Sequence, residues 1–365
     1  MKVVFFSSFI SPHMKPFCDY LSQKCDFTYV QTIQLTEERK KMGYAFSETI
    51  PYLVDLSDNK EQQKKLAVDA DCVIINSGST DAEIVSDRIH QNRITFFCNE
   101  RLFKKGFIKY ADPRLWKQWR INRMARGKNT YLLCLGSYVS RDFERVGFEK
   151  GKSFKFGYFP EVGSSLKYQE TDGLHLIWVG RMIDWKQPEL MIAVSEELEK
   201  RSIPFTIDMI GDGPLRDKVE IKRSRLKQPQ NVILHGLLQN DEVRQLMAQA
   251  DALVMTSNRQ EGWGAVANEA LGTGTPVVSF ETIGAANYLI QDGYNGKLCR
   301  ENNLSHLVDA ILEIKHHEAS YRMNALETTE VWNAAVAAER FLKVYECCKS
   351  EGCAVFYDNG LLSKA

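Results

Sequence analysis

The stretch 252-ALVMTSNRQEGWGAVANEALGTGTPVVSF-280 decides how this chain folds. It opens with the apolar run ALVM and closes with VVSF, and both runs are short enough to be buried strands. Between them, residues 265–272 have the composition of a short helix and are flanked by glycines. A strand, a helix and a second strand in this order predict a parallel sheet covered by helices.

The same alternation extends toward the amino terminus, as far as a polar connector at 161–173, EVGSSLKYQETDG. We place a domain boundary in this connector because it is rich in Gly, Ser and charge and has no apolar periodicity. After it come the strand-like runs LHLIWVG, FTIDMIG and NVILHG, separated from one another and from the stretch above by helical segments at 189–201, 215–226 and 241–250. Five strands alternating with helices are typical of a doubly wound domain.

The first half repeats this pattern with strand candidates at KVVFF (2–6), 27–30, 72–76, 94–98 and 131–135 and a first helix at 16–23. Residues 331–349 have the pattern of an amphipathic helix. We therefore predict two Rossmann-like α/β domains, 1–165 and 166–335, followed by a C-terminal helix and tail, 336–365, that packs back on the first domain.

The composition is that of a folded enzyme-sized chain. Its 365 residues are 44% hydrophobic and 26% charged, which excludes a disordered or coiled-coil protein. No apolar run reaches the roughly 18 residues that span a bilayer, and the amino terminus lacks a signal-peptide pattern. The nine cysteines form no CxxC pair, so a reducing compartment fits better than a disulfide framework. We expect a cytoplasmic protein.

The formal net charge of zero hides an asymmetry between the halves. Residues 1–166 carry 26 Lys and Arg against 19 Asp and Glu, which leaves 21 against 28 for the rest. The segment Arg101–Lys128 holds ten basic residues and one acid, Asp112, so its partner should be anionic. One reading is contact with an anionic membrane face through Trp116 and Trp119. The alternatives are a solvated basic helix or a nucleic-acid surface, and no known nucleic-acid motif accompanies the segment.

Candidate binding groups follow the strands, where doubly wound domains bind ligands. Arg181 and Lys186 follow the run LIWVG and could hold a pyrophosphate, although two solvated cations would look the same. Gly211 and Gly213 lie in the turn GDGP, which lacks the third glycine of a dinucleotide fingerprint. A nicotinamide site is therefore disfavoured.

The strongest local signal is the pair of acids in EGWGAVANE, Glu261 and Glu269. Gly262 and Gly264 would let the backbone approach an anion, and the helix that starts there offers unpaired amides. Glu269 could accept hydrogen bonds from sugar hydroxyls, as acidic residues do for ribose in nucleotide-binding folds. Taken singly, each acid could equally be an exposed surface residue.

Six motifs in the second half give the chain its resemblance to a family. They are GRMIDWK (180–186), MIGDGP (209–214), NVILHG (231–236), EGWGAVANE (261–269), EALGTGTPVVSF (269–280) and IGAANYLIQDGYNGKL (283–298). In this order they resemble the group 1, family 4-like retaining GT-B glycosyltransferases of bacterial polysaccharide biosynthesis. The resemblance implies two Rossmann-like domains facing a central cleft, an N-terminal one for the acceptor and a C-terminal one for the nucleotide-sugar donor.

The resemblance also implies roles for individual residues. Arg181 and Lys186 would bind the donor diphosphate, Glu261 would contact the transferred sugar, and Glu269 would hold the ribose hydroxyls. His235 and Gly236 would lie near the base. The remaining donor-site residues would be Gly180, Gly211, Gly213, Gly262, Trp263, Gly264, Ala265 and Val266. No cofactor and no metal are implied, and a UDP-sugar is favoured over a GDP-sugar.

The first half is similar to a subset of bacterial polysaccharide glycosyltransferases. The motifs are SPHMKPFC (11–18), TEERKKMGY (36–44), FFCNERLFKKG (96–106) and FKFGYFPEV (154–162). His13, Glu100 and Arg101 would then face the acceptor, and His13 would orient or deprotonate its hydroxyl. A structural role for His13 is the alternative. The loop SSFISPH departs from the family because it has no glycine.

The expected reaction is transfer of a sugar, with retention of configuration, from a nucleoside diphosphate to a saccharide or lipid-linked saccharide. The catalytic candidates are Glu261, Arg181, Lys186 and His13. The rivals are a nucleotide-sugar epimerase or phosphorylase on the same scaffold and a non-catalytic sugar-nucleotide-binding subunit. We expect no nucleic-acid partner, and the Arg101–Lys128 segment would place the protein at the inner face of the plasma membrane.

Overall fold

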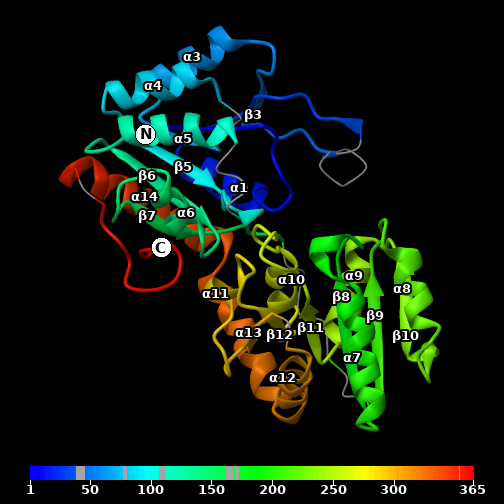
Figure 1. The fold of residues 1–365 in the computed structure, drawn as a ribbon. Helices are drawn as coiled ribbons and strands as arrows, with labels where there is room; N and C mark the ends of the chain where they lie inside the picture. Colours follow the sequence, from blue (N-terminus) through cyan, green and yellow to red (C-terminus); the bar gives the residue numbers. More distant parts are fainter. Residues whose placement is uncertain are drawn as a thin grey trace. The chain divides into compact units, whose positions relative to one another are not determined.

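The computed structural model describes residues 1–37, 46–76, 80–106, 112–161, 168, 172–301, 303–352 and 354–365. Most of the motif at 36–44 and of the connector at 161–173 lies outside these residues. The chain divides into two compact units (Figure 1). Met1–Glu161 and Trp332–Ala365 form unit 1, and Val162–Val331 forms unit 2.

Unit 1 is built on a seven-stranded parallel sheet with the strand order β3-β2-β1-β4-β5-β6-β7. The strands are β1 (Lys2–Ser7), β2 (Asp26–Gln31), β3 (Leu53–Asp55), β4 (Cys72–Ile75), β5 (Thr95–Asn99), β6 (Thr130–Leu135) and β7 (Ser153–Phe156). The helices are α1 (Lys15–Lys24), α3 (Lys60–Asp69), α4 (Ala82–His90), α5 (Pro113–Met124), α6 (Val139–Arg145) and α14 (Ala334–Glu351).

The sheet of unit 1 is buried on both faces, which is why its strands read as continuous apolar runs. Phe96 and Phe97 are neighbours in β5 and point to opposite faces. The ring of Phe97 lies 6.5 Å from that of Phe148, on the face that α3, α4 and α6 cover. The ring of Phe96 lies 5.1 Å from that of Phe341 in α14. The last helix of the chain therefore contributes to the core of the first unit.

Unit 2 contains a six-stranded parallel sheet in the order β10-β9-β8-β11-β12-β13. The strands are β8 (Leu174–Val179), β9 (Phe205–Ile210), β10 (Val232–Gly236), β11 (Ala252–Met255), β12 (Val277–Phe280) and β13 (Gly296–Cys299). The helices are α7 (Glu189–Lys200), α8 (Arg216–Arg223), α9 (Asn240–Gln249), α10 (Val266–Gly272), α11 (Ala286–Leu289), α12 (Leu304–His316) and α13 (Glu318–Val331), with the 3₁₀ turns η3 (Asp184–Lys186) and η4 (Pro229–Asn231).

The predicted pair of doubly wound α/β sheets is confirmed. Three short strands, β3, β7 and β13, have no counterpart in the prediction. Of these, β13 is the sequence GKLC, in which a glycine and a lysine interrupt the apolar pattern. Such strands form because a neighbouring strand offers its backbone groups, which the sequence pattern does not show.

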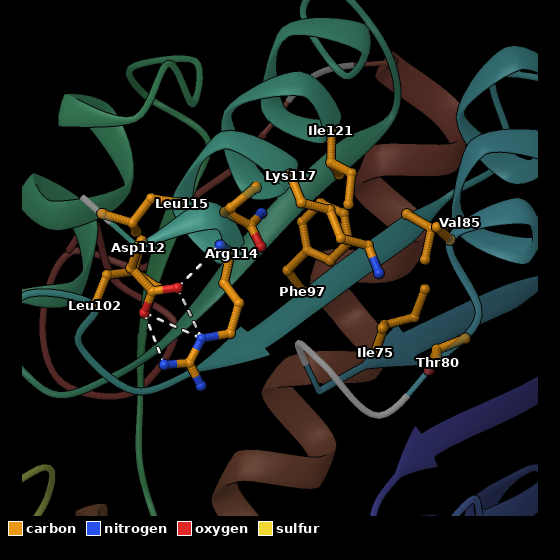
Figure 2. A pocket seen from close by; sticks show the side chains of 12 residues that line it. Ile75, Thr80, Val85, Phe97, Leu102, Asp112, Arg114, Leu115, Lys117 and Ile121 are labelled. Atoms are coloured by element: carbon orange, nitrogen blue, oxygen red, sulfur yellow. Dashed lines mark hydrogen bonds and ion pairs between the residues drawn. The ribbon is translucent and has the colours of Figure 1, made fainter. Parts of the chain in front are cut away.

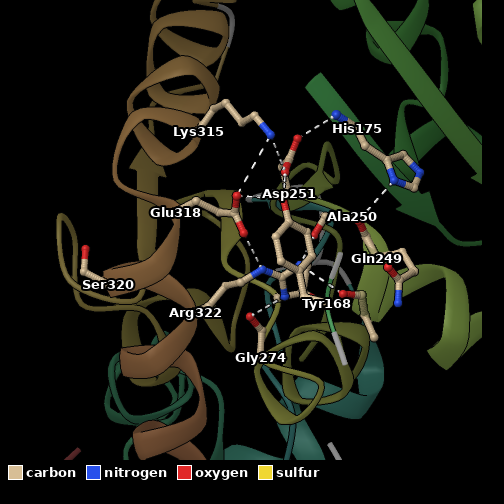
Figure 3. A network of polar contacts seen from close by, with 12 residues as sticks. Tyr168, His175, Gln249, Ala250, Asp251, Gly274, Lys315, Glu318, Ser320 and Arg322 are labelled. Carbon is tan, nitrogen blue, oxygen red and sulfur yellow. Dashed lines mark hydrogen bonds and ion pairs between the residues drawn. The ribbon is translucent and has the colours of Figure 1, made fainter. Parts of the chain in front are cut away.

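A polar network ties the helices α12 and α13 to the amino ends of β8 and β11 (Figure 3). The carboxylate of Asp251 accepts hydrogen bonds from Tyr168 Oη at 2.7 Å, Lys315 Nζ at 3.0 Å and the amide of His175 at 2.7 Å. Arg322 donates to the carbonyls of Ala248, Ala250 and Gly274. These contacts lie at the amino ends of the strands and stabilise unit 2, whereas doubly wound sheets bind ligands at the carboxyl ends.

Candidate active site

Two loops meet at the point where the strand order of unit 2 reverses, between β8 and β11. Lys186, in the loop after β8, places its Nζ 2.5 Å from Glu261 Oε2, in the loop after β11. The two side chains are 17% and 14% exposed. Doubly wound sheets bind ligands at this switch point, outside the carboxyl ends of the strands. The structure therefore brings together two of the predicted catalytic residues, from segments 75 positions apart.

Thr256 holds the loop that carries Lys186. Its Oγ1 donates to the carbonyl of Lys186 at 2.7 Å and accepts from Trp178 Nε1 at 2.8 Å. The amide of Asn258 donates to the carbonyl of Trp185 at 2.8 Å. Sequence reasoning missed these supporting residues. The only sequence signal is a buried tryptophan, whose N–H needs a partner, facing a threonine that ends the next strand in the sheet.

Arg181 is exposed at the end of β8, with its guanidinium carbon 5.8 Å from the centre of the Trp185 ring. Within the described part of the chain it has no carboxylate partner. Because its planar donors are unoccupied, Arg181 can hold two oxygens of a phosphate group. Lys186 adds a second positive charge five residues later.

Gly211 and Gly213 are required by the packing of two loops. Gly211 has φ +128°, and a Cβ there would lie 1.9 Å from the carbonyl oxygen of Gly180. Gly213 has φ +155°, and a Cβ there would lie 2.6 Å from the carbonyl oxygen of Met182. The amide of Met182 donates to the carbonyl of Asp212 at 2.8 Å. These two glycines thus allow the close packing of the loop that carries Arg181. Their contact with the donor stays a prediction.

The segment 262–266 leads into α10. The amide of Ala267 donates to the carbonyl of Gly264, so the amides before it belong to the first turn and have no acceptor within the helix. Gly264 has φ +90°, a conformation that favours glycine. The Trp263 ring is buried and donates its Nε1 to Asn268 Oδ1 at 2.7 Å. The indole N–H of Trp263 is therefore engaged within unit 2.

Glu269 lies one turn further along α10. Burial raises the pKa of its carboxyl group to about 7, although the charge of Arg244 opposes this shift. Among the described residues no side chain donates a hydrogen bond to it. A carboxyl group that is poorly hydrated and has no donor among these side chains lowers the stability of the fold, and such groups are common at binding sites.

His235 is the last residue but one of β10, and its Nε2 lies 2.7 Å from Asp208 Oδ1. His175 Nε2 lies 2.6 Å from the other oxygen, Oδ2. Burial opposes the charge on Asp208, but the hydrogen bonds from the two histidines outweigh it and lower the pKa of this carboxyl. Burial likewise opposes the charge on His175, and its bond to Asp208 nevertheless raises its pKa. Asp208 therefore holds the His235 ring by one nitrogen, an arrangement that the sequence analysis did not foresee.

In unit 1, Tyr158 connects two of the predicted acceptor-side residues. Its ring centre lies 6.1 Å from that of His13, and its hydroxyl donates to Glu100 Oε1 at 3.1 Å. Burial lowers the pKa of His13, which keeps its imidazole neutral near pH 7. Its Nδ1 is buried without a hydrogen-bond partner in the described structure. His13 is thus in the protonation state that a general base needs.

Arg101, the third acceptor-side candidate, is held inside unit 1. Its Nε lies 3.7 Å from Asp142 Oδ2, and its guanidinium carbon lies 4.6 Å from the centre of the Tyr138 ring. These contacts explain the position of Arg101 by packing and charge pairing. Within the described ranges, no group of three or more His, Cys, Asp or Glu side chains has the arrangement of a metal site.

Comparison with known proteins shows what the region that carries this site is similar to. Residues 167–330 match the family described as glycosyl transferases group 1. An uncharacterized glycosyltransferase of Methanocaldococcus jannaschii, MJ1178, is 28% identical over 189 residues, which are 51% of this chain and 50% of that protein. The poly(ribitol-phosphate) alpha-N-acetylglucosaminyltransferase of Staphylococcus aureus is 24% identical over 202 residues, 54% of this chain and 40% of that enzyme. The matched region thus spans half or less of these relatives.

Solved structures share the fold along nearly the whole chain. Anabaena HepE in complex with UDP superposes with a TM-score of 0.68 at 15% identity, covering 95% of this chain and 100% of HepE. The lipopolysaccharide outer core galactosyltransferase WaaB superposes with a TM-score of 0.68 at 16% identity, covering 96% of this chain and 100% of WaaB. The fold is thus GT-B, and residues 167–330 match the group 1 glycosyltransferase family.

Proposed function

We propose that this protein transfers a sugar from a nucleoside diphosphate sugar, with a UDP-sugar preferred, to a saccharide or lipid-linked saccharide with retention of configuration. The observation that carries the proposal is the pairing of Lys186 with Glu261 at the switch point of unit 2. Arg181, in the same loop as Lys186, has no carboxylate partner among the described residues. The S. aureus relative is named for transfer of N-acetylglucosamine to a phosphate polymer, and HepE was solved with UDP. Both support a donor of this class and a role in surface polysaccharide biosynthesis.

In the proposed reaction, the bond between the anomeric carbon and the diphosphate oxygen breaks, and a bond to the acceptor oxygen forms on the same face. The acceptor proton passes to the departing phosphate oxygen or to His13. Arg181, Lys186 and the amides of the first turn of α10 stabilise the charge that grows on the diphosphate. Glu261 contacts the transferred sugar, and Glu269 accepts the ribose hydroxyls. These cations and amides supply the charge that a metal ion supplies elsewhere, so we expect activity without added metal or cofactor.

The decisive experiment removes one cation from the site. Lys186→Ala should lower turnover about 100-fold, because one charge-stabilising group contributes a few kcal/mol to the barrier. Lys218→Ala is the matched control, since Lys218 pairs with Glu189 on the surface. The assay is release of UDP or GDP from a panel of sugar nucleotides in the presence of acceptor saccharides.

Three outcomes would contradict the proposal. Wild-type turnover in Lys186→Ala would refute the diphosphate assignment. Stabilisation by nucleotide in thermal melts without any turnover would point to a non-catalytic binding subunit. Interconversion of the donor sugar without transfer would identify an epimerase.

A further inference from the structure

Unit 1 contains a cavity of about 410 Å³ between α4 and α5, beside the carboxyl ends of β4 and β5 (Figure 2). This volume lies within the range of about 300–1,000 Å³ that small-molecule sites occupy. None of the residues assigned above to the donor or the acceptor hydroxyl lines it. The lining residues are Ile75, Thr80, Ala82, Val85, Phe97, Leu102, Asp112, Arg114, Leu115, Lys117, Gln118 and Ile121.

The inner part of this cavity is apolar. Ile75 ends β4, and Phe97 lies in the middle of the adjacent strand β5. Val85 comes from α4, and Leu115 and Ile121 come from α5. A sugar placed against these side chains would lose the hydrogen bonds that its hydroxyl groups make with water. An alkyl chain has no hydrogen bonds with water to lose, and the burial of its apolar surface favours binding.

The rim of the cavity carries positive charge. Asp112 caps the amino end of α5 and is paired with Arg114, with Nη2 and Oδ2 2.7 Å apart. Lys117, one turn further along α5, is exposed and has no ion-pair partner in the part of the chain that the structure describes. Figure 2 shows Lys117 and Ile121 on α5 facing Val85 on α4. An unpaired cation at the mouth of an apolar cavity suits a molecule with an apolar chain and an anionic head group.

The outer face of α5 is consistent with the same kind of ligand. Trp116 and Trp119 are 65% and 37% exposed, and their ring centres are 6.4 Å apart. Arg120 and Arg123 lie on the same exposed face, and the helix contains no acidic residue. Exposed tryptophans beside arginines are typical of surfaces that touch the boundary between lipid and water.

We propose that the cavity between α4 and α5 binds the hydrocarbon chain of a lipid phosphate, and that Lys117 binds its phosphate. This inference rests on the proposed glycosyl transfer, for which it identifies the acceptor as a lipid-linked molecule. The outer face of α5 then contacts the anionic surface from which that lipid comes. Under this proposal, the anionic partner expected for the basic segment Arg101–Lys128 is a lipid phosphate.

The test is calorimetric titration of the full-length protein with octyl phosphate below its critical micelle concentration. We expect saturable binding of octyl phosphate, weaker binding of octyl glucoside and no binding of inorganic phosphate. Lys117→Gln should weaken octyl phosphate binding about tenfold, which is the loss of one charged hydrogen bond. Ala82→Phe fills the cavity from its partly exposed rim and should weaken binding of octyl phosphate and octyl glucoside alike. Arg120→Gln removes the same charge from α5 outside the cavity and should bind octyl phosphate normally.

Four results would overturn the inference. The first is that inorganic phosphate binds as tightly as octyl phosphate, and the second is that octyl glucoside does so and Lys117→Gln does not change its binding. The third is that Ala82→Phe binds octyl phosphate normally. The fourth is that the protein binds anionic vesicles but not monomeric octyl phosphate. UDP binding, measured on the same variants, separates this inference from the proposed function because Lys186 and Glu261 belong to unit 2. Variants that lose octyl phosphate should still bind UDP. A protein that binds octyl phosphate but no nucleotide would refute the proposed function and leave the cavity assigned.

Discussion

Glu269 has two properties that are common in ligand-binding residues. Its carboxyl group has no hydrogen-bond donor among the described side chains, and burial raises its pKa to about 7. A hydrated carboxylate on the surface would lower the stability of the folded protein less than this buried one does. We expect two hydroxyl groups of a ligand to donate hydrogen bonds to this carboxylate, because the described side chains donate none. In unit 1, the buried Nδ1 of His13 likewise has no hydrogen-bond partner within the described ranges.

Replacing Glu269 with glutamine should therefore stabilise the protein and weaken nucleotide binding. The raised pKa means that between about pH 4.5 and pH 7 the folded protein keeps a proton that the unfolded chain has lost, so stability falls as pH rises. At pH 8, Glu269→Gln should raise the free energy of unfolding by ~1–3 kcal/mol and lower UDP affinity about tenfold. Urea titrations at pH 5 and pH 8 measure the first effect, with the exposed Glu196→Gln as control. If the free energy of unfolding changes between pH 5 and pH 8 by the same amount in Glu269→Gln as in the unsubstituted protein, the role of Glu269 is contradicted.

Strands and helices with a buried apolar pattern could be predicted from the sequence, and so could the loops that follow them. The proximity of Lys186 and Glu261 could be predicted because each lies in the loop after a strand-like run, and the carboxyl ends of parallel strands meet. Their roles stay predictions. The strand β3 and the positioning residue Thr256 could not be predicted, because each depends on a neighbour that only the folded chain supplies. Tyr158, which joins His13 to Glu100, is one more contact of this kind.

The polar cluster across β8, β9 and β10 should give unit 2 a characteristic dependence on pH. His175 has a raised pKa, so its bond to Asp208 contributes fully below about pH 6.5 and is lost as pH rises through the folded value. Asp208 has a lowered pKa, so its contribution exists above about pH 4 and is lost as pH falls. Asp208→Asn should therefore lower the free energy of unfolding most, by about 2 kcal/mol, between about pH 4 and pH 6.5, and by less at pH 8.5. Denaturant unfolding across this range tests it, and an equal loss at pH 5.5 and 8.5 would refute it.

Each of the two units has its own sheet and its own buried core, and the chain visits unit 1 twice. The returning segment packs α14 on the sheet and then runs beside β7, where Lys155 exchanges backbone hydrogen bonds with Leu362 and Ser363. This pairing covers an edge strand that would otherwise expose its backbone groups. Residues at opposite ends of the sequence therefore share one core, whereas the residues proposed for the donor site all lie in the continuous stretch that forms unit 2.

The separation of cores predicts two unfolding transitions that respond to different changes. Phe341 is fully buried, and its ring packs against Phe17 at 6.1 Å and Phe96 at 5.1 Å, all within unit 1. Phe341→Ala should lower the stability of unit 1 by about 3–5 kcal/mol, the usual cost of emptying an aromatic site. UDP should raise only the other transition, because a ligand stabilises the unit that binds it. Differential scanning calorimetry with and without UDP measures both shifts, and one transition that responds equally to the substitution and to UDP would show that the two cores unfold together.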